Sequence, residues 1–121
     1  MDILELVENF YNSFKGEKGV IGKSVETIGS NAFSYCSSLT GVEIGESVKW
    51  ISSYAFYRCT SLEDVVMGKS VISIGKEAFA YCSLKTIKCR GSAADWANIT
   101  KGTSWDSVTG SYTVTYNYDG E

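Results

Sequence analysis

One short motif recurs along the chain at a fixed interval, and this repeat limits the fold more than any other feature. The sequence Ala-Phe-x-x-Cys begins at Ala32, Ala55 and Ala78, which is an interval of 23 residues both times. An isoleucine before each Phe, a leucine after each Cys and an apolar-x-apolar pair after the leucine recur with the motif. A repeat of this length predicts a solenoid, in which successive coils stack and share one continuous core.

Each repeat divides into two segments with different patterns. Residues 39–44 alternate apolar and polar side chains, which is typical of a half-buried strand. Residues 30–36 are too short for an independent helix but fit one helical turn that begins at Ser or Asn. Part of an earlier coil is visible around Ile21, and the third copy lacks one residue between Cys82 and Leu84. The sequence therefore predicts three coils and a partial fourth on the N-terminal side.

The full pattern, Ile-Gly-x-x-Ala-Phe-x-x-Cys-x-x-Leu-x-x-Val-x-Ile, resembles the BspA-type leucine-rich repeats of bacterial surface proteins. Residues 28–44 and 74–89 carry it best, and the resemblance extends over residues 21–92. Such repeats usually place Pro after the strand, where this chain has Gly45 and Gly68, so we expect a different turn there. The resemblance implies an α/β repeat solenoid, a short leucine-rich-repeat-like right-handed coil with parallel strands on its concave face. It also implies cell-surface adhesion to host proteins and other bacteria.

The two ends of the array are predicted to be caps, because terminal coils would otherwise expose the core. Near the N-terminus, apolar residues follow the spacing of one face of an amphipathic helix: Ile3, Leu6, Val7, Phe10, Tyr11 and Phe14. A helix that binds a partner or a membrane surface is the alternative, but its Glu-rich polar positions disfavour anionic membranes. We expect an N-terminal amphipathic helical cap at residues 1–19 and leucine-rich-repeat-like coils at residues 20–92.

The C-terminal residues 93–121 are expected to form a second cap, composed of a short helix and a β-strand. Residues 92–99 have the pattern of a short helix, and its Trp96 falls on the isoleucine column occupied by Ile74. Residues 111–118 alternate and are rich in strand-forming residues. The turn-forming pair Asp119-Gly120 at the end leads us to expect that the natural chain continues.

Composition argues against several classes of function. The net charge of −3 offers no basic excess to neutralise phosphates, so nucleic-acid binding is not expected. Histidine is absent, which removes the usual general base near neutral pH and the commonest metal ligand. No apolar run approaches the roughly 18 residues of a membrane-spanning helix, and the first residues lack the pattern of a signal peptide. We expect neither an enzyme nor a cofactor, and no membrane insertion.

The four cysteines raise the question of a disulfide or a metal site. Cys36, Cys59 and Cys82 occupy one repeat column, and Cys89 occupies the apolar strand column of Ile44. We expect a ladder of buried free thiols, with a disulfide or a metal site as alternatives. Neighbouring strands lie about 4.8 Å apart, which permits a bridge, but parallel Cβ vectors disfavour it.

Aromatic residues are numerous, with eight tyrosines and three tryptophans, and they could form a platform for carbohydrate. The alternative is that they belong to the scaffold. Tyr35 and Tyr81 recur beside the cysteine column, on the expected helical side, and Trp50 and Trp96 fall in or near core columns.

Strand positions that point away from the core are expected to stack into ladders on the concave face, where solenoids usually bind their partners. The three ladders are Val20, Glu43, Val66, Lys88; Lys18, Gly41, Asp64, Thr86; and Gly22, Gly45, Gly68, Arg90. These positions depart from the repeat pattern, and their mixture of charges suits a protein partner. The candidate protein-binding residues are Glu43, Asp64, Val66, Thr86, Lys88 and Arg90. A face that is merely solvated is the alternative.

The sequence thus predicts a monomeric, non-enzymatic module for protein–protein interaction or adhesion, part of a bacterial surface or secreted protein. Its extracellular or cell-surface location follows from the family resemblance, with any signal peptide outside this chain. The alternative is a structural spacer within a longer repeat array, with no ligand of its own.

Overall fold

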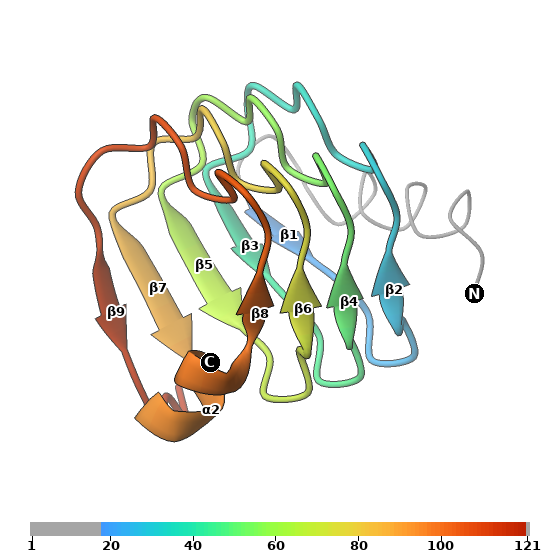
Figure 1. The fold of residues 1–121 in the computed structure, drawn as a ribbon, viewed down its shortest axis with the longest axis vertical. Helices are drawn as coiled ribbons and strands as arrows, with labels where there is room; N and C mark the ends of the chain where they lie inside the picture. Colours follow the sequence, from blue (N-terminus) through green and yellow to red (C-terminus); the bar gives the residue numbers. More distant parts are fainter. Residues whose placement is uncertain (1–17, 121) are drawn as a thin grey trace.

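The computed structural model describes residues 18–120, in which the chain winds through two parallel β-sheets (Figure 1). Nine strands and one short helix follow one another: β1 (Lys18–Val20), β2 (Thr27–Ile28), β3 (Gly41–Glu43), β4 (Trp50–Ile51), β5 (Asp64–Met67), β6 (Ser73–Ile74), β7 (Thr86–Cys89), α2 (Ala93–Asn98), β8 (Thr100–Lys101) and β9 (Thr113–Thr115). Odd-numbered strands form a five-stranded sheet in the order β1-β3-β5-β7-β9. Even-numbered strands form a four-stranded sheet in the order β2-β4-β6-β8.

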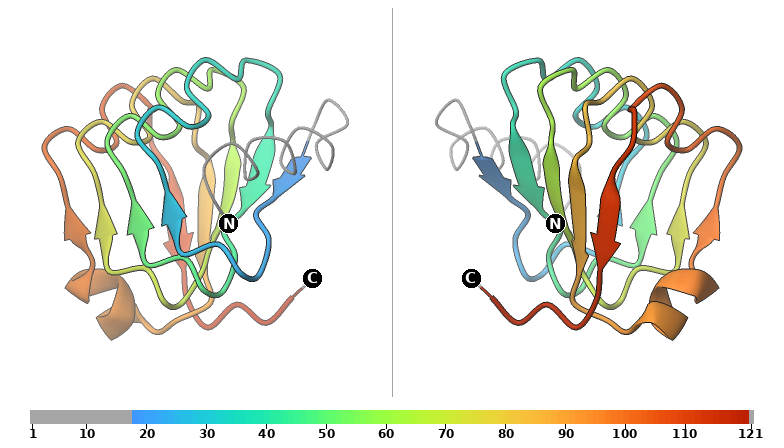
Figure 2. Two further views of the ribbon diagram at one scale, coloured as in Figure 1. Left: turned by 90° about the vertical axis from the view of Figure 1, so that its right-hand side faces the viewer. Right: turned by 90° about the vertical axis from the view of Figure 1, so that its left-hand side faces the viewer.

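Equivalent positions of the repeat lie side by side in neighbouring coils. Val42 pairs with Val65, and Val65 pairs with Ile87, so that the register of the five-stranded sheet reproduces both the 23-residue interval and the one-residue deletion in the third copy. Every strand pair is parallel, and Figure 2 shows the coils stacked along one direction. The predicted parallel repeat solenoid is confirmed.

The prediction of a helical turn in each repeat is wrong. The Ala-Phe-x-x-Cys segment lies in a long turn that leads from the four-stranded to the five-stranded sheet, at residues 29–40, 52–63 and 75–85, and residues 102–112 form the equivalent long turn of the last coil. In these long turns Phe33 N donates to the Ala55 carbonyl of the next coil (2.8 Å), and Phe56 N donates likewise to Ala78 (2.7 Å). Backbone groups that bond to the next coil cannot form the i to i−4 bonds of a helix. Residues with positive φ, such as Asn31 and Tyr35, also interrupt a right-handed helix.

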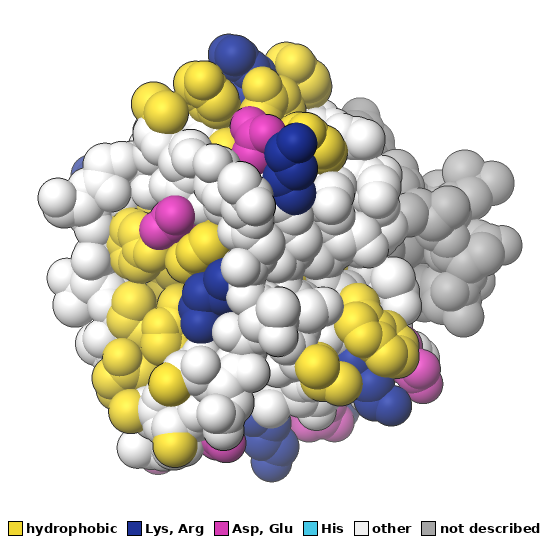
Figure 3. All heavy atoms as spheres, in the orientation of Figure 1, with side chains coloured by type: hydrophobic (Ala, Val, Ile, Leu, Met, Phe, Trp, Pro, Cys, Tyr) yellow, Lys and Arg dark blue, Asp and Glu magenta, His cyan; other side chains and the backbone are white. Residues whose placement is uncertain are grey.

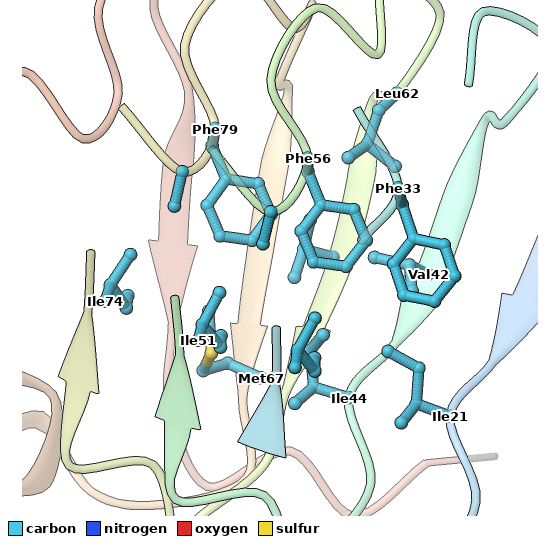
Figure 4. Close-up of a cluster of buried hydrophobic side chains, with 14 of the residues drawn as sticks. Ile21, Phe33, Val42, Ile44, Ile51, Phe56, Leu62, Met67, Ile74 and Phe79 are labelled. Carbon is cyan, nitrogen blue, oxygen red and sulfur yellow. The ribbon is translucent and has the colours of Figure 1, made fainter. Parts of the chain in front are cut away.

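The repeat columns fill the space between the two sheets. Phe33, Phe56 and Phe79 stack with ring centroids 5.4 and 5.0 Å apart, and the isoleucine and leucine columns lie beside them (Figure 4). All three rings are 2% exposed or less. Complete burial of a side chain of this kind stabilises the fold by roughly 1.5–3 kcal/mol, so the repeated phenylalanines contribute much of the core energy.

Close approach of the backbone accounts for one glycine column. A Cβ atom on Gly45 would lie 2.6 Å from the Ile21 carbonyl oxygen, and one on Gly68 would lie 2.6 Å from the Gly45 carbonyl oxygen. Gly22, at the end of the same column, has no atom within 4 Å of such a position. None of the three has a positive φ. Gly45 and Gly68 are therefore needed for their missing side chain, because the neighbouring coil leaves no room for a larger residue at these two positions.

The C-terminal segment is a further coil of the solenoid rather than a cap beside it. The expected short helix is present as α2, where Ser92 and Asp95 form a capping box, but the chain then adds β8 to one sheet and β9 to the other. Lys101, and not Trp96, pairs with Ile74, because α2 shifts Trp96 out of the isoleucine column. The expectation of a separate helical cap is therefore not supported at this end. The expected N-terminal helix lies outside the described residues.

Candidate functional site

The strand registers bring the candidate residues together on the outer face of the five-stranded sheet. Glu43 pairs with Val66, and Val66 pairs with Lys88. In the adjoining ladder Asp64 pairs with Thr86. The parallel strands explain this arrangement, since side chains two residues apart on a strand lie on the same face. All six candidate residues come from β3, β5, β7 or the residue directly after β7.

An open depression of about 320 Å³ lies over this face. Val66 is only 9% exposed and forms part of its lining, so this side chain is largely buried, contrary to the expectation of an exposed position. On one side the Thr86 hydroxyl donates to an Asp64 carboxylate oxygen (2.6 Å). On the other side Lys88 and Tyr118 line the depression. The site thus combines an apolar floor with charged and polar groups at its margins.

Arg90 is already engaged within the chain. Its guanidinium lies 3.6 Å from a Glu43 carboxylate oxygen, and both side chains are about one quarter exposed. The same group donates to the Gly120 carbonyl oxygen (3.2 Å) and lies 5.3 Å from the centroid of the Tyr118 ring. Arg90 therefore holds the C-terminal tail and links the acidic and basic halves of the face.

Tyr118 is a residue of this site that sequence reasoning missed. After β9 the chain turns back beneath the lower ends of the five-stranded sheet (Figure 2), and Tyr118 N donates to the Cys89 carbonyl oxygen (2.9 Å). The Tyr118 ring lies 5.2 Å from Lys88 Nζ. The alternation of residues 111–118 predicted a strand but carried no signal that its end folds back.

The cysteine column is a ladder of free thiols, as predicted. The Cys59 thiol donates to the Phe33 carbonyl oxygen (3.0 Å), and the Cys82 thiol donates to the Phe56 carbonyl oxygen (3.2 Å). Burial raises the pKa of Cys82 to about 12 and that of Cys89 to about 11. Cys36, at the end of the ladder, is half-buried, and the hydrogen bond with Cys59 lowers its pKa to about 7.

Other kinds of site have little support in the part of the chain that the structure describes. Within residues 18–120 no group of three or more His, Cys, Asp or Glu side chains is placed to hold a metal ion. No helix in that range is long and apolar enough to cross a membrane.

Comparison with known families gives one match. The description of this family is "BspA type Leucine rich repeat region (6 copies)", and its model matches residues 7–100. The chain belongs to this family of leucine-rich repeat proteins. No curated protein and no solved structure matches the chain.

Proposed function

We propose that the chain is a non-enzymatic module for protein–protein interaction or adhesion that binds its partner on the outer face of the five-stranded sheet. Membership of the BspA-type family supports interaction with proteins as the general role. A bacterial surface or secreted protein as the parent, and a host or bacterial surface protein as the ligand, belong to this proposal.

The observation that carries the choice of face is the contrast between the two sides of each strand. Side chains that point inward repeat through the middle coils, whereas those that point outward change from Glu43 to Val66 to Lys88 along one ladder. An apolar floor bordered by Asp64, Thr86, Lys88 and Tyr118 offers a partner both buried contact area and charged groups. Interfaces of proteins commonly have an apolar centre with a polar rim.

Charge reversal on the face tests this proposal. Binding of the chain to immobilised serum proteins, extracellular-matrix proteins and whole bacterial cells is measured for the wild type and for Lys88→Glu and Asp64→Lys. Each variant should weaken binding to the protein that the wild type recognises by tenfold or more, since opposite-charge contacts become repulsive. Lys23→Glu, an exposed lysine in a turn, is the matched control and should bind as the wild type does.

Circular dichroism confirms that each variant is folded. Unchanged binding by both folded variants contradicts the assignment of this face. A wild type that binds no protein in any of the three sets favours instead the second candidate function, a structural spacer within a longer array. The stacking of coils through open parallel sheets is the observation that supports that second candidate.

A further inference from the structure

A second surface, independent of the face proposed above, lies on the long turns. Four tyrosines and one arginine gather there in the coils of β2, β4 and β6, and we name them the tyrosine–arginine ridge: Tyr35, Tyr54, Tyr57, Arg58 and Tyr81. Figure 3 shows hydrophobic side chains with Lys or Arg and Asp or Glu side chains over these turns, at the top of the view. Tyr35 is 65% exposed.

The rings of the ridge hold one another in fixed positions. The Tyr57 ring lies edge-on to Tyr35, Tyr54 and Tyr81, with centroids 5.8, 5.3 and 5.7 Å apart. The Tyr54 hydroxyl donates to a Glu77 carboxylate oxygen (3.3 Å). A surface that is already ordered loses little conformational entropy when a partner binds, and tyrosine offers a large contact area with few rotatable bonds.

The backbone beneath the ridge is strained at equivalent positions of successive coils. Tyr35, Arg58 and Tyr81 have φ values of 64°, 59° and 61°. The left-handed region costs a residue with a side chain roughly 1–2 kcal/mol, and glycine would avoid that cost. The chain has 12 glycines elsewhere yet keeps large side chains at these positions. The equivalent residue of the last coil, Val108, has the same conformation (φ 57°), so this turn geometry presents a side chain at the same position of each of these coils.

Arg58 determines which chemistry the ridge can recognise. Its guanidinium lies over the Tyr81 ring (4.3 Å from the centroid) and near the Tyr57 ring (5.4 Å). In the part of the chain that the structure describes, no carboxylate forms an ion pair with Arg58, whereas Arg90 is paired with Glu43. The guanidinium group also has a hydrogen bond with the Tyr57 side chain, but it carries five N–H donors, and those that remain match the two oxygens of a carboxylate.

The same geometry disfavours the carbohydrate platform considered from the sequence. A sugar stacks on the open face of an aromatic ring, but Arg58 covers the face of Tyr81, and the rings meet one another edge-on. Tyrosine and arginine are instead the residues enriched where protein interfaces concentrate their binding energy. We propose that the tyrosine–arginine ridge docks an acidic segment of a partner protein, with a carboxylate of that segment paired to Arg58.

Two synthetic peptides test the ridge directly. One contains four consecutive glutamates between glycine and tyrosine residues, and the other replaces each glutamate with glutamine. Titration into isotopically labelled protein, followed by NMR, should shift the amide signals of residues 54–58 and 81 with the glutamate peptide only. Arg58→Gln should weaken this binding tenfold or more, and Arg58→Lys should weaken it severalfold because lysine keeps the charge but loses the planar fork.

Lys69→Gln removes a positive charge from an exposed turn elsewhere and is the matched control, for which affinity should equal that of the wild type. Circular dichroism and the urea unfolding midpoint show whether each variant is folded. Where an Arg58 variant is not folded, Tyr81→Phe, which keeps the ring, is measured in its place. Equal binding of the two peptides, no binding of either, or full affinity in folded Arg58→Gln overturns the proposal. Shifts of the same amide signals with a hyaluronate oligosaccharide, but not with the glutamate peptide, overturn the proposal that the partner is a protein. Neither peptide result depends on Lys88 or Asp64, so the sheet-face proposal stands or fails separately.

Discussion

The middle coils and the C-terminal coil share one backbone path but fill their interiors by different means. In the middle coils each column repeats one kind of residue, as in the stack of Phe33, Phe56 and Phe79. In the last coil Phe79 N bonds to the Trp105 carbonyl, in the way that Phe56 N bonds to that of Ala78. Trp105 therefore takes the position of the alanine in the Ala-Phe-x-x-Cys motif, and Asp106 takes the position of the phenylalanine.

The difference shows how the core changes at the last described coil. In place of a further stacked phenylalanine, the last described coil turns a large indole across the core. Trp105 lies edge-on to Phe79 (6.2 Å) and contacts Trp96 (5.8 Å) and Tyr112 (6.3 Å). The Tyr112 hydroxyl donates to an Asp106 carboxylate oxygen (2.6 Å). A repeat thus extends the core through the middle coils, and the departure from the repeat changes how the core packs in the last described coil.

Alanine substitutions in the two regions should give the largest effects and separate them. Phe56→Ala removes a fully buried ring between two others and should lower the free energy of unfolding by about 3–5 kcal/mol. Trp105→Ala, in a half-buried position, should cost about 2 kcal/mol because its site is partly open to solvent. Urea denaturation measures both values. A larger loss for Trp105→Ala than for Phe56→Ala would reverse the comparison.

The glycine column offers a sharper contrast within the regular part. Gly68→Ala places a Cβ 2.6 Å from a backbone oxygen of the neighbouring coil and should destabilise the fold by roughly 2–3 kcal/mol. Gly22→Ala, at the end of the same column, meets nothing and should change stability by less than about 0.5 kcal/mol. Thermal unfolding of the two variants is the measurement, and similar melting temperatures contradict the close packing of the coils.

The thiol ladder predicts how stability changes in alkali. Burial raises the folded-state pKa of Cys82 from 9.0 to about 12 and that of Cys89 to about 11, so the folded protein retains protons that the unfolded chain releases. This contribution is fully present below pH 9 and is lost as the pH rises towards 11–12. The last coil has no thiol at the equivalent position. There Thr109 follows Val108 in the way that Cys82 follows Tyr81, and Val108 and Tyr81 both have a positive φ.

Urea unfolding at pH 8, 9, 10 and 11 measures this loss for the wild type and for a variant with Cys82→Ala and Cys89→Ala. The stability of the variant should fall less steeply with pH than that of the wild type. Parallel curves contradict burial of the two thiols.

The smallest expected effect lies on the exposed turn of the last coil. Val108 is 68% exposed and has a φ of 57°, which is unfavourable for a β-branched residue. Val108→Gly should raise the stability by about 0.5–1 kcal/mol, because relief of strain exceeds the entropy that glycine adds to the unfolded chain. Differential scanning calorimetry measures the shift, and a lower melting temperature contradicts the strained geometry.

Repetition made the core and the strand registers predictable, because a residue such as Val65 has equivalents in the coils on both sides. The 23-residue interval, together with the one residue missing between Cys82 and Leu84, was enough to predict that Asp64 lies beside Thr86 and Val66 beside Lys88, and the strand registers confirm both pairs. The long turns were not predictable, because Ala-Phe-x-x-Cys fits a helical turn by composition, and only bonding to the next coil excludes it. The insertion of α2 and the return of Tyr118 had no equivalent in the repeat, so no column could predict them.

Solution NMR tests most directly the central claim that residues 93–115 form a coil of the solenoid. The strand pairs β7–β9 and β6–β8 place Ile87 beside Val114 and Ile74 beside Lys101. The account predicts nuclear Overhauser effects between the backbone protons of both pairs, one in each sheet. Their absence from a folded sample, with the Val42–Val65 contact still observed, would contradict it.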